Sequence, residues 1–238
     1  MAIPRFYCPE DVPEKGVFGL PEHARHHAFR VLRLRGGEEI ALFDGRGNEA
    51  RCRVLDSSSV EILEKFSMDR ESKISMNLVQ SLVSNEKTDW IVQKAVELGA
   101  KSVQIVETKR SVVKLSGERA KKREAHWLSI AISACEQCGR NRIPGIHPVM
   151  PIEDWLVEMR EGSKYLLSPH GKSLKSCPPP GGEIFLLVGP EGGLSPEEED
   201  LAKSSGFEEL GLGPRILRTE TAGLAALSSF NALWGDFS

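Results

Sequence analysis

The sequence predicts an α/β protein in which a domain with a mainly parallel β-sheet follows a small β-rich domain. Three observations support this fold class. After residue 71, apolar runs of strand length alternate with runs of helix length, as in parallel sheets covered on both faces. Two glycine-rich loops each join an apolar run to a helix start. Before residue 70, short runs are separated by turn residues, which is typical of antiparallel strands.

Residues 1–70 form the expected β-rich domain. Its strands are expected at Glu39–Phe43, Glu49–Leu55 and Val60–Lys65. The segment Asp44–Asn48 contains an Asp-Gly pair between the first two strands, which is a hairpin signal. The polar and charged segment Ser67–Lys73 marks the boundary to a second domain of residues 71–238.

One helix is expected in the first domain, over Glu22–Leu34. Its apolar stripe consists of Ala24, Ala28, Val31 and Leu32. The basic residues His26, Arg30 and Arg33 fall on another face of the helix. This basic face is suited to gripping RNA, and the alternative is a solvated helix face without a partner.

The second domain alternates between strand and helix patterns. The expected strands are Ser75–Val83, Ser102–Val106, Ile146–Val149, Lys164–Ser168, Glu183–Val188 and Glu209–Leu212. The expected helices are Glu86–Leu98, Glu118–Cys138, Ile152–Met159, Pro196–Ser205 and Thr219–Trp234. The carboxyl ends of parallel strands meet at one edge of a sheet. We therefore expect Leu166-Leu167-Ser168, Leu187-Val188-Gly189 and Leu212-Gly213 to line one crevice.

The two glycine-rich loops lie within Leu187–Pro196 and Leu212–Ala222. Glycine lets backbone N–H groups approach a ligand closely, and a helix start offers unpaired N–H donors. These loops are therefore expected to bind a ligand through the backbone. The alternative is an ordinary tight turn, because Gly-Pro pairs mark turns.

The helix after the first loop has a clear start signal. Ser195, Pro196 and Glu198 match the N-cap, first position and third position of a capping box. The acidic run Glu197–Asp200 beside the loop would repel phosphate groups. The loop also lacks the phosphate-binding and dinucleotide-binding fingerprints. We therefore expect a ligand that is not rich in phosphate.

The last helix, Thr219–Trp234, is apolar nearly all round. Such a helix lies either in the centre of the core or against a partner subunit. The sequence thus leaves both a core helix and a homodimer contact open.

The composition is that of an ordinary globular protein with a net charge of −3. No apolar run reaches the ~18 residues of a membrane helix, and Met1–Phe6 does not resemble a signal peptide, so a cytoplasmic location without a membrane partner is expected. The five cysteines are scattered and odd in number, which fits reduced thiols. Cys135 and Cys138 lack a second pair, so we expect them to pack in a helix and expect no metal site.

Basic residues gather in two stretches although the net charge is negative. The first runs from His23 to Gly37 without an acidic residue, and the second runs from Lys109 to Glu124 and is followed by Arg140 and Arg142. Clusters of this kind can neutralise the phosphates of a nucleic acid. Solvated helix faces are again the alternative.

Motifs along the whole chain resemble one known family. They are Arg5-Phe6-Tyr7, His26-His27, Val31-Leu32-Arg33, Lys87, Trp90, Gln93-Lys94, Glu97-Leu98-Gly99, Arg110-Ser111, Glu136-Gln137, Gly139-Arg140, Val188-Gly189-Pro190-Glu191-Gly192-Gly193, Leu212-Gly213 and Arg215-Ile216-Leu217-Arg218-Thr219-Glu220-Thr221-Ala222. This pattern resembles the RsmE family of 16S ribosomal RNA uridine-N3 methyltransferases, which belong to the SPOUT class and use S-adenosyl-L-methionine. Cys135 and Cys138 stand where small residues are expected in relatives.

The resemblance implies an N-terminal PUA-like RNA-binding β-barrel, a C-terminal SPOUT methyltransferase domain with a trefoil knot, and a homodimer. Nothing in the periodicity indicates a knot. The implied partner is 16S rRNA in the small ribosomal subunit. The implied cofactor-binding residues are Leu167, Ser168, Val188, Gly189, Pro190, Glu191, Gly192, Leu212, Gly213, Ile216 and Leu217. The implied RNA-binding residues are Arg5, His26, Arg30, Arg33, Arg110, Arg140 and Arg142.

The implied reaction sets a chemical demand, because uracil N3 carries a proton that must leave or whose anion must be stabilised. Arg218 and Arg140 are the cations expected at the uracil oxygens, and Glu191 or Glu220 is the candidate base. The alternatives are a helix-start salt bridge between Arg218 and Glu220, and a dipole-stabilising role for Glu220. Two alternatives apply to the function of the whole protein. One is a related enzyme that acts on tRNA or another rRNA position, and the other is an RNA-binding or assembly factor without catalysis.

Overall fold

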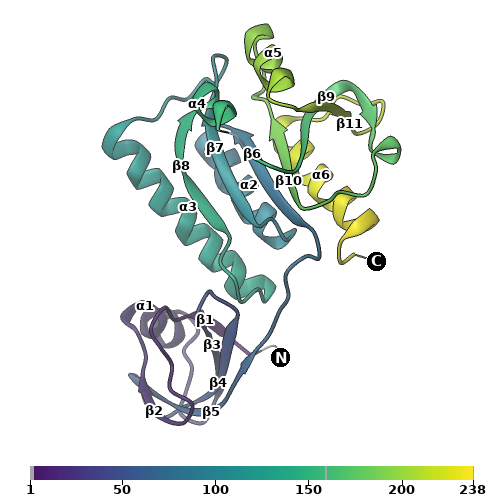
Figure 1. Ribbon diagram of the computed structural model, residues 1–238. Coiled ribbons are helices and arrows are strands. Elements are labelled where there is room, and N and C mark those ends of the chain that lie inside the picture. Colours follow the sequence, from purple (N-terminus) through teal and green to yellow (C-terminus); the bar gives the residue numbers. More distant parts are fainter. Residues whose placement is uncertain (1–2, 159, 238) are drawn as a thin grey trace. The chain divides into compact units, whose positions relative to one another are not determined.

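The computed structural model describes residues 3–158 and 160–237, and these residues form two compact units (Figure 1). The first unit comprises residues up to Glu71 together with Ile132–Ile143, and the second comprises Ser72–Ala131 and the chain from Pro144 onward. The sequence had assigned residues 132–143 to the second domain. They group with the first because side chains near its two ends, Arg5 and Arg70, bind them.

Hydrogen bonds make this grouping explicit. Arg5 donates to the carbonyl oxygen of Arg140 at 3.1 Å and to the side chain of Asn141. Arg70 donates to the carbonyl oxygen of Gly139 at 2.7 Å. Arg5 and Arg70 also share the buried carboxylate of Glu49. None of these partners is close in sequence, so local patterns cannot indicate the grouping.

The first unit contains a five-stranded sheet in the order β1-β3-β4-β5-β2. Its strands are β1 (Arg5–Tyr7), β2 (Gly16–Gly19), β3 (Glu39–Phe43), β4 (Asn48–Val54) and β5 (Ser59–Ser67). The β3–β4 pair is the expected antiparallel hairpin, whereas β1 pairs parallel with β3. The carboxylate of Asp44 accepts hydrogen bonds from the backbone N–H groups of Arg46 and Asn48 and thereby fixes the turn.

The helix predicted over Glu22–Leu34 takes a different form. An α-helical turn, α1 (Glu22–Arg25), continues into a π-helix, η1 (His26–Val31), and Arg33 follows with a left-handed φ of 57°. A π-helical turn contains an extra residue, which rotates the later side chains around the axis. Val31 and Leu32 are therefore 57% and 45% exposed, contrary to the predicted stripe. Phe29 and Leu34 pack against the core in their place.

The second unit is built on a six-stranded sheet in the order β11-β9-β10-β6-β7-β8, and all neighbouring strands are parallel. The strands are β6 (Ser75–Ser81), β7 (Ser102–Glu107), β8 (Gly145–Pro151), β9 (Ser163–Ser173), β10 (Glu183–Val188) and β11 (Glu208–Gly211). The helices are α2 (Asn85–Glu97), α3 (Gly117–Cys138), α4 (Ile152–Val157), the 3-10 helix η2 (Leu174–Ser176), α5 (Pro196–Ser204) and α6 (Thr219–Trp234). The predicted α/β class with a parallel sheet is confirmed, while Met159, the predicted end of α4, lies outside the described residues.

The three central strands of this sheet, β10, β6 and β7, are largely buried, whereas the edge strand β8 is not. β6 is buried along nearly its whole length, and β10 ends in three buried apolar residues. The capping box at the start of α5 is confirmed: the Ser195 hydroxyl accepts from the Glu198 N–H, and the Glu198 carboxylate accepts from the Ser195 N–H. α6 packs one face against the sheet, through Gly223, Leu227 and Phe230, while Thr221, Ala232 and Leu233 are exposed.

β9 contains an irregularity that the sequence did not indicate. Its pairing with β11 shifts, so that Glu209 lies opposite Leu166 and the next residue, Leu210, lies opposite Lys172. The intervening residues of β9 therefore leave the ladder. Gly171 is required beside this excursion, because a Cβ there would lie 2.4 Å from the backbone nitrogen of Leu210.

The cysteines behave as packed thiols. Cys135 is buried in α3, and burial raises the pKa of its thiol to about 12. No group of three or more His, Cys, Asp or Glu side chains among the described residues is arranged to hold a metal ion. Within the same residues, no helix is long and apolar enough to cross a bilayer.

Candidate active site

A cavity of about 480 Å³ lies in the second unit, where the middle of β9 and the carboxyl ends of β10 and β11 meet the start of α6. Its lining residues are Lys87, Leu166, Leu167, Ser168, Pro169, Val188, Gly189, Pro190, Glu191, Gly193, Leu194, Glu199, Leu210, Leu212, Gly213, Arg215, Ile216, Leu217, Arg218, Thr219 and Ala222. The structure thus brings the three predicted strand ends to one place. The excursion of β9 carries Leu167 and Ser168 into the lining.

Every predicted cofactor-binding residue except Gly192 lines this cavity. A Cβ at Gly192 would meet only the aliphatic part of Arg110, at 3.6 Å, which is ordinary contact. The restrictive glycine is Gly189, where a Cβ would lie 3.2 Å from the backbone nitrogen of Leu194. Of these two glycines, Gly189 is therefore the one where an added Cβ would press against the loop backbone.

The loop from Gly189 to Leu194 is held from its outer side. The Gly193 N–H donates to the Pro190 carbonyl at 2.9 Å, which closes a tight turn. One nitrogen of Arg110 donates to the carbonyl oxygens of Gly192 and Leu194, at 2.8 and 3.0 Å. The alternative of a tight turn is therefore what the structure has, and this turn lines the cavity.

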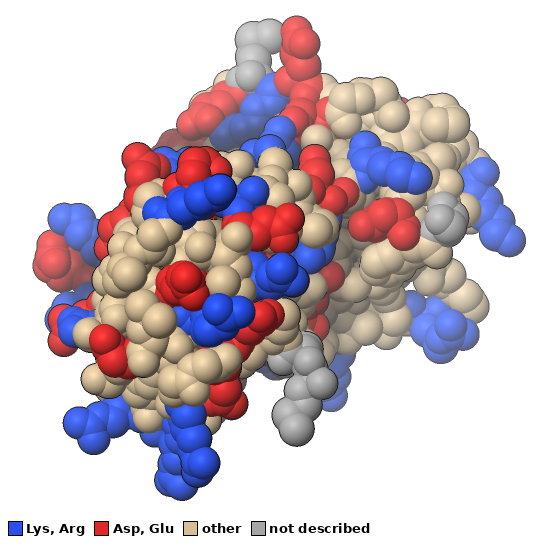
Figure 2. All heavy atoms as spheres, turned by 90° about the horizontal axis from the view of Figure 1, so that it is seen from below, with Lys and Arg blue, Asp and Glu red and all other residues tan. Residues whose placement is uncertain are grey.

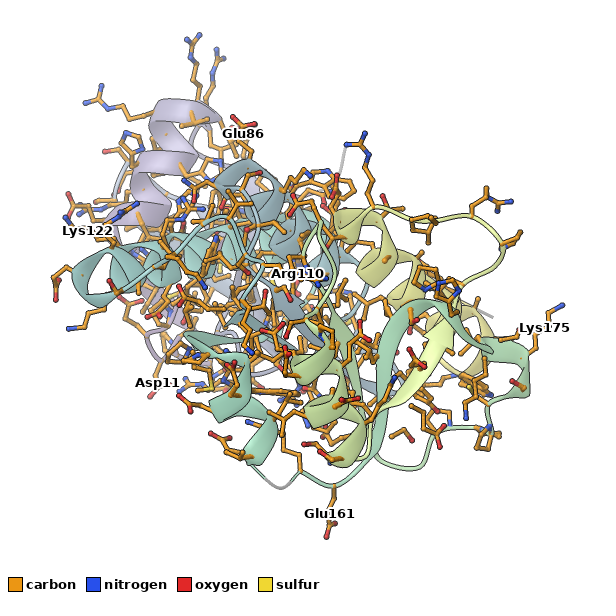
Figure 3. The ribbon with its side chains drawn as sticks, turned by 90° about the horizontal axis from the view of Figure 1, so that it is seen from above. Asp11, Glu86, Arg110, Lys122, Glu161 and Lys175 are labelled. Atoms are coloured by element: carbon orange, nitrogen blue, oxygen red, sulfur yellow. The ribbon has the colours of Figure 1, made fainter. Side chains whose placement is uncertain are left out.

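Arg110 was predicted to bind RNA, and the structure uses its guanidinium on this loop (Figure 3). Lys175 gives a contrast, because it points outward at the edge of the molecule (Figure 3). The neighbouring backbone is tied down as well: the Lys109 N–H donates to the Glu198 carboxylate at 2.7 Å. The segment around Arg110 thus supports the cavity wall.

Lys87, from α2, joins two acidic residues at the cavity. Its ammonium lies 2.9 Å from the Glu191 carboxylate and 3.3 Å from that of Glu220. Partial burial acts to raise the pKa of Glu191, but the hydrogen bond from Lys87, a backbone hydrogen bond and the charge of Lys87 together outweigh it and lower that pKa. Hydrogen bonding to Glu191 in turn raises the pKa of Lys87. A lowered pKa makes Glu191 a weak proton acceptor, which argues against a role as general base.

The arginines of the second loop are exposed, and Arg215 and Arg218 both line the cavity. Within the described residues, neither forms an ion pair with a carboxylate. The alternative of a salt bridge between Arg218 and Glu220 is not what the structure has, since Glu220 faces Lys87. Glu220 does not line the cavity. Two cations are therefore available at the rim for a negatively charged group.

Arg140 and Arg5 require a correction. Arg140 lies in the first unit, is only 4% exposed and is ion-paired with Glu71. It does not line the cavity. The Arg5 guanidinium is engaged by Glu49, Asn141 and the Arg140 carbonyl. Arg140 is therefore buried and ion-paired, and Arg5 is partly buried and hydrogen-bonded within the first unit, so the structure uses both guanidinium groups inside that unit.

The other predicted RNA-binding residues, His26, Arg30, Arg33 and Arg142, are exposed in the first unit. His26 and Arg30 lie on η1, and Arg33 follows it. Figure 2 shows a face on which basic and acidic side chains interleave. On that face the positive charge is therefore local and does not form one continuous surface.

The sequence reasoning did not assign Lys87, Arg215 or Thr219 to the site. All three line the cavity. Lys87 is placed by the sheet order, because α2 follows β6, and β6 is the neighbour of β10. The alternation of strands and helices does not specify the order of strands in the sheet, so it could not place Lys87 at the site. For Arg215 and Thr219 the signal was their position in the second glycine-rich loop.

Comparisons with known proteins agree with this geometry. A family model described as an RNA methyltransferase domain matches residues 70–231, and one described as an RNA methyltransferase PUA domain matches residues 20–64. The chain is 33% identical to ribosomal RNA small subunit methyltransferase E of Bacillus subtilis, covering 93% of this chain and 92% of that protein. It is 30% identical to the protein of the same name from Buchnera aphidicola, covering 99% and 95%.

A solved structure is also similar over the full length of both chains. It is a ribosomal RNA small subunit methyltransferase E from Neisseria gonorrhoeae bound to S-adenosyl methionine, and it is 41% identical with a TM-score of 0.93.

The Lys87 contact predicts a pH effect. Replacing Lys87→Met should raise the pKa of Glu191, because the ammonium is lost while the partial burial remains. The pKa of Glu191 is lower in the folded chain than its usual value of 4.5 in the unfolded chain. The contact therefore stabilises the fold fully at pH values above 4.5. That contribution is lost as the pH falls through the folded pKa. Carboxyl NMR titration measures the pKa, and urea unfolding at pH 7 and at acidic pH measures the stability difference.

The matched control is Lys175→Met, which removes a peripheral lysine (Figure 3). It should leave the pKa of Glu191 where it is. An unchanged Glu191 titration in Lys87→Met would show that the ammonium does not set this pKa.

Proposed function

Because the chain belongs to the ribosomal RNA small subunit methyltransferase E family, we propose that it transfers a methyl group from S-adenosylmethionine to N3 of one uridine in 16S ribosomal RNA. The observation that carries the proposal is the cavity assembled from three strand-end loops. It supports cofactor binding because a full-length similar structure from Neisseria gonorrhoeae contains S-adenosyl methionine. We propose the assembled small subunit in the cytoplasm as the substrate.

The cavity fits this cofactor by size and chemistry. Its volume of about 480 Å³ lies in the range of small-molecule sites, ~300–1,000 Å³. Leu167, Leu212 and Leu217 offer apolar surface for an adenine ring, and the glycine loop offers backbone groups. The carboxylates of Glu191 and Glu199 suit an ammonium group. When bound, the cofactor supplies an electrophilic methyl group on a positively charged sulfur.

We assign charge stabilisation to Arg218. Methylation at N3 requires the N3 proton to leave, and negative charge then spreads onto the uracil oxygens. Arg218 is exposed, lines the cavity and is not ion-paired with Glu220, so its guanidinium is available to those oxygens. Glu191 and Glu220 instead form ion pairs with Lys87, which favours a supporting role for both carboxylates.

We propose that the first unit forms a PUA-like barrel that binds RNA and that the second is the methyltransferase domain with a trefoil knot. The family-model matches at residues 20–64 and 70–231 support this division. An experimental electron-density trace through residues 163–222 that shows no knot would rule out the knot.

We also propose a homodimer that uses the open face of α6. Thr221, Ala232 and Leu233 are exposed there, and Leu233 is apolar. An isologous contact of two such faces would bury them. Light scattering at micromolar concentration decides between dimer and monomer, and a monomeric mass would exclude this contact.

The exposed arginines near η1 predict salt-dependent RNA binding. Arg30→Ala and Arg33→Ala should each weaken binding to small ribosomal subunits and lower the slope of log affinity against log salt by about 0.7–0.9. Cofactor affinity should not change. The control is Arg53→Ala, because Arg53 is already ion-paired with Glu61 at 3.1 Å. Binding that is insensitive to salt and to both substitutions would remove this surface from the RNA contact.

The glycine loop predicts a selective effect on the cofactor. Gly189→Ala should weaken S-adenosylmethionine binding by about tenfold or more, because the new Cβ displaces the loop backbone at Leu194. Gly192→Ala is the matched control and should bind within about twofold of wild type, since only the aliphatic part of Arg110 lies nearby. Calorimetry measures both affinities, and the reverse order would place the cofactor elsewhere.

The charge-stabilising role predicts a rate effect at Arg218. Arg218→Ala should bind cofactor and ribosomal subunits nearly as wild type does, yet transfer the methyl group about 10²–10³-fold more slowly. Arg218→Lys should restore only part of the rate, because a point charge lacks the planar fork of the guanidinium. Single-turnover transfer measures the rates, and mass spectrometry of the product nucleosides identifies the methylated position.

Lys175→Ala serves as the control for a lost surface cation in the same unit. Wild-type transfer by Arg218→Ala would end its catalytic assignment. Joint loss of cofactor binding and transfer would return Arg218 to a structural role in the loop. A wild-type protein that binds subunits but transfers nothing would favour an assembly factor without catalysis.

A further inference from the structure

A buried chain of hydrogen bonds joins the central strand β6 to both loops of the cavity. Gln80, near the end of β6, donates from its amide nitrogen to the Thr219 hydroxyl at 2.9 Å. The Thr219 hydroxyl donates to the carbonyl oxygen of Gly189 at 2.6 Å. Gln80 is 0% exposed and Thr219 is 7% exposed. The hydrogen-bond chain therefore reaches the cavity lining at Thr219 and Gly189, and its side chains are largely shielded from water.

The direction of the chain is fixed by its chemistry. The Gln80 amide nitrogen also donates to the Ser81 carbonyl at 3.1 Å, and a carbonyl oxygen can only accept. The amide nitrogen, and not its oxygen, must therefore face Thr219. Because the hydroxyl then accepts from Gln80, its single proton is directed to the Gly189 carbonyl. Successive hydrogen bonds of this kind strengthen one another in a buried setting.

The side-chain amide of Gln80 is less favourable at this buried position than an apolar side chain would be, if packing alone is considered. Its oxygen is buried without a hydrogen-bond partner among the described residues, which carries a free-energy cost. An apolar side chain of the same shape would avoid that cost. The glutamine therefore adds two hydrogen bonds at this position, to the Ser81 carbonyl and to Thr219, and the bond to Thr219 is the one that reaches the cavity.

Two of the three residues in this hydrogen-bond chain, Thr219 and Gly189, belong to the proposed machinery. Gly189 begins the glycine loop of the cavity, and Thr219 is the first residue of α6, directly after Arg218. One hydroxyl thus fixes the spacing between the cofactor loop and the backbone that carries Arg218.

We propose that Thr219 and Gln80 are positioning residues for methyl transfer, which rests on the function proposed above. Thr219 holds the Arg218 backbone against the Gly189 loop, and Gln80 orients the Thr219 hydroxyl. A purely structural tie would lower stability when broken but leave the transfer rate of the folded, cofactor-saturated protein unchanged. A positioning role lowers that rate even when the protein is folded and saturated.

The test compares Thr219→Val, which keeps the shape and removes the hydroxyl, with Thr219→Ser, which keeps the hydroxyl. Single-turnover transfer to small ribosomal subunits is measured at saturating S-adenosylmethionine, and calorimetry and thermal melting verify saturation and folding. Thr219→Val should be slower by about 10–100-fold, and Thr219→Ser should recover to within about threefold of wild type. Gln80→Met should be slower by about tenfold, and adding it to Thr219→Val should have little further effect, because both break one chain.

A wild-type rate in folded, saturated Thr219→Val overturns the proposal, as does an equal defect in Thr219→Ser. If Thr219→Val does not fold, Gln80→Met decides, since it leaves the Thr219–Gly189 contact in place. Amide hydrogen exchange of residues 189–194 and 218–221 provides a readout that needs no methyl acceptor. Faster exchange in both segments is expected in Thr219→Val and not in Thr219→Ser, and unchanged exchange counts against the coupling. Absence of transfer by wild type would refute the proposed function, while exchange would still decide whether the chain couples the loops.

Discussion

The site depends on the parallel pairing of β10 with β6 on one side and with β9 on the other. Parallel strands all end at the same edge of a sheet, so the segments that follow them are neighbours in space even when they are distant in sequence. β11 extends this arrangement, because it pairs with β9. The cavity is therefore lined by segments that belong to the strands of one sheet or directly follow them.

The walls of the cavity are held from behind by polar contacts. Arg110 fixes the carbonyl side of the glycine loop, and Glu198 ties the backbone of Lys109 to the start of α5. Thr219 connects the same loop to α6. These contacts use charged or hydroxyl groups on backbone partners, and aliphatic and glycine residues make up much of the inner surface. Such a surface suits a ligand that is recognised by shape and backbone hydrogen bonds.

The charges around the cavity fall into two groups. Lys87 neutralises part of the negative charge of Glu191 and Glu220, and these three residues hold α2, the glycine loop and α6 together. Arg215 and Arg218 line the cavity without an ion-pair partner among the described residues. Because an unpaired exposed guanidinium remains hydrated and costs little free energy, it is free to bind a negatively charged group when one arrives. The ion-paired residues around Lys87 support the structure, and the guanidinium groups of Arg215 and Arg218 are available to bind a substrate.

The sequence by itself determined the alternation of strands and helices, the capping box at Ser195 and the two loops that meet at the cavity. These features depend on local periodicity and on turn and cap chemistry, which neighbouring residues specify. Only the tertiary structure decided where single side chains point. Arg140 was predicted at the reaction and is buried against Glu71, and Val31 was predicted in the core and is exposed by a π-helical turn. Lys87 entered the site because the strand order places α2 beside the glycine loop. Strand order, ion-pair partners and an extra residue in a helical turn depend on contacts between distant segments, which local sequence patterns do not contain.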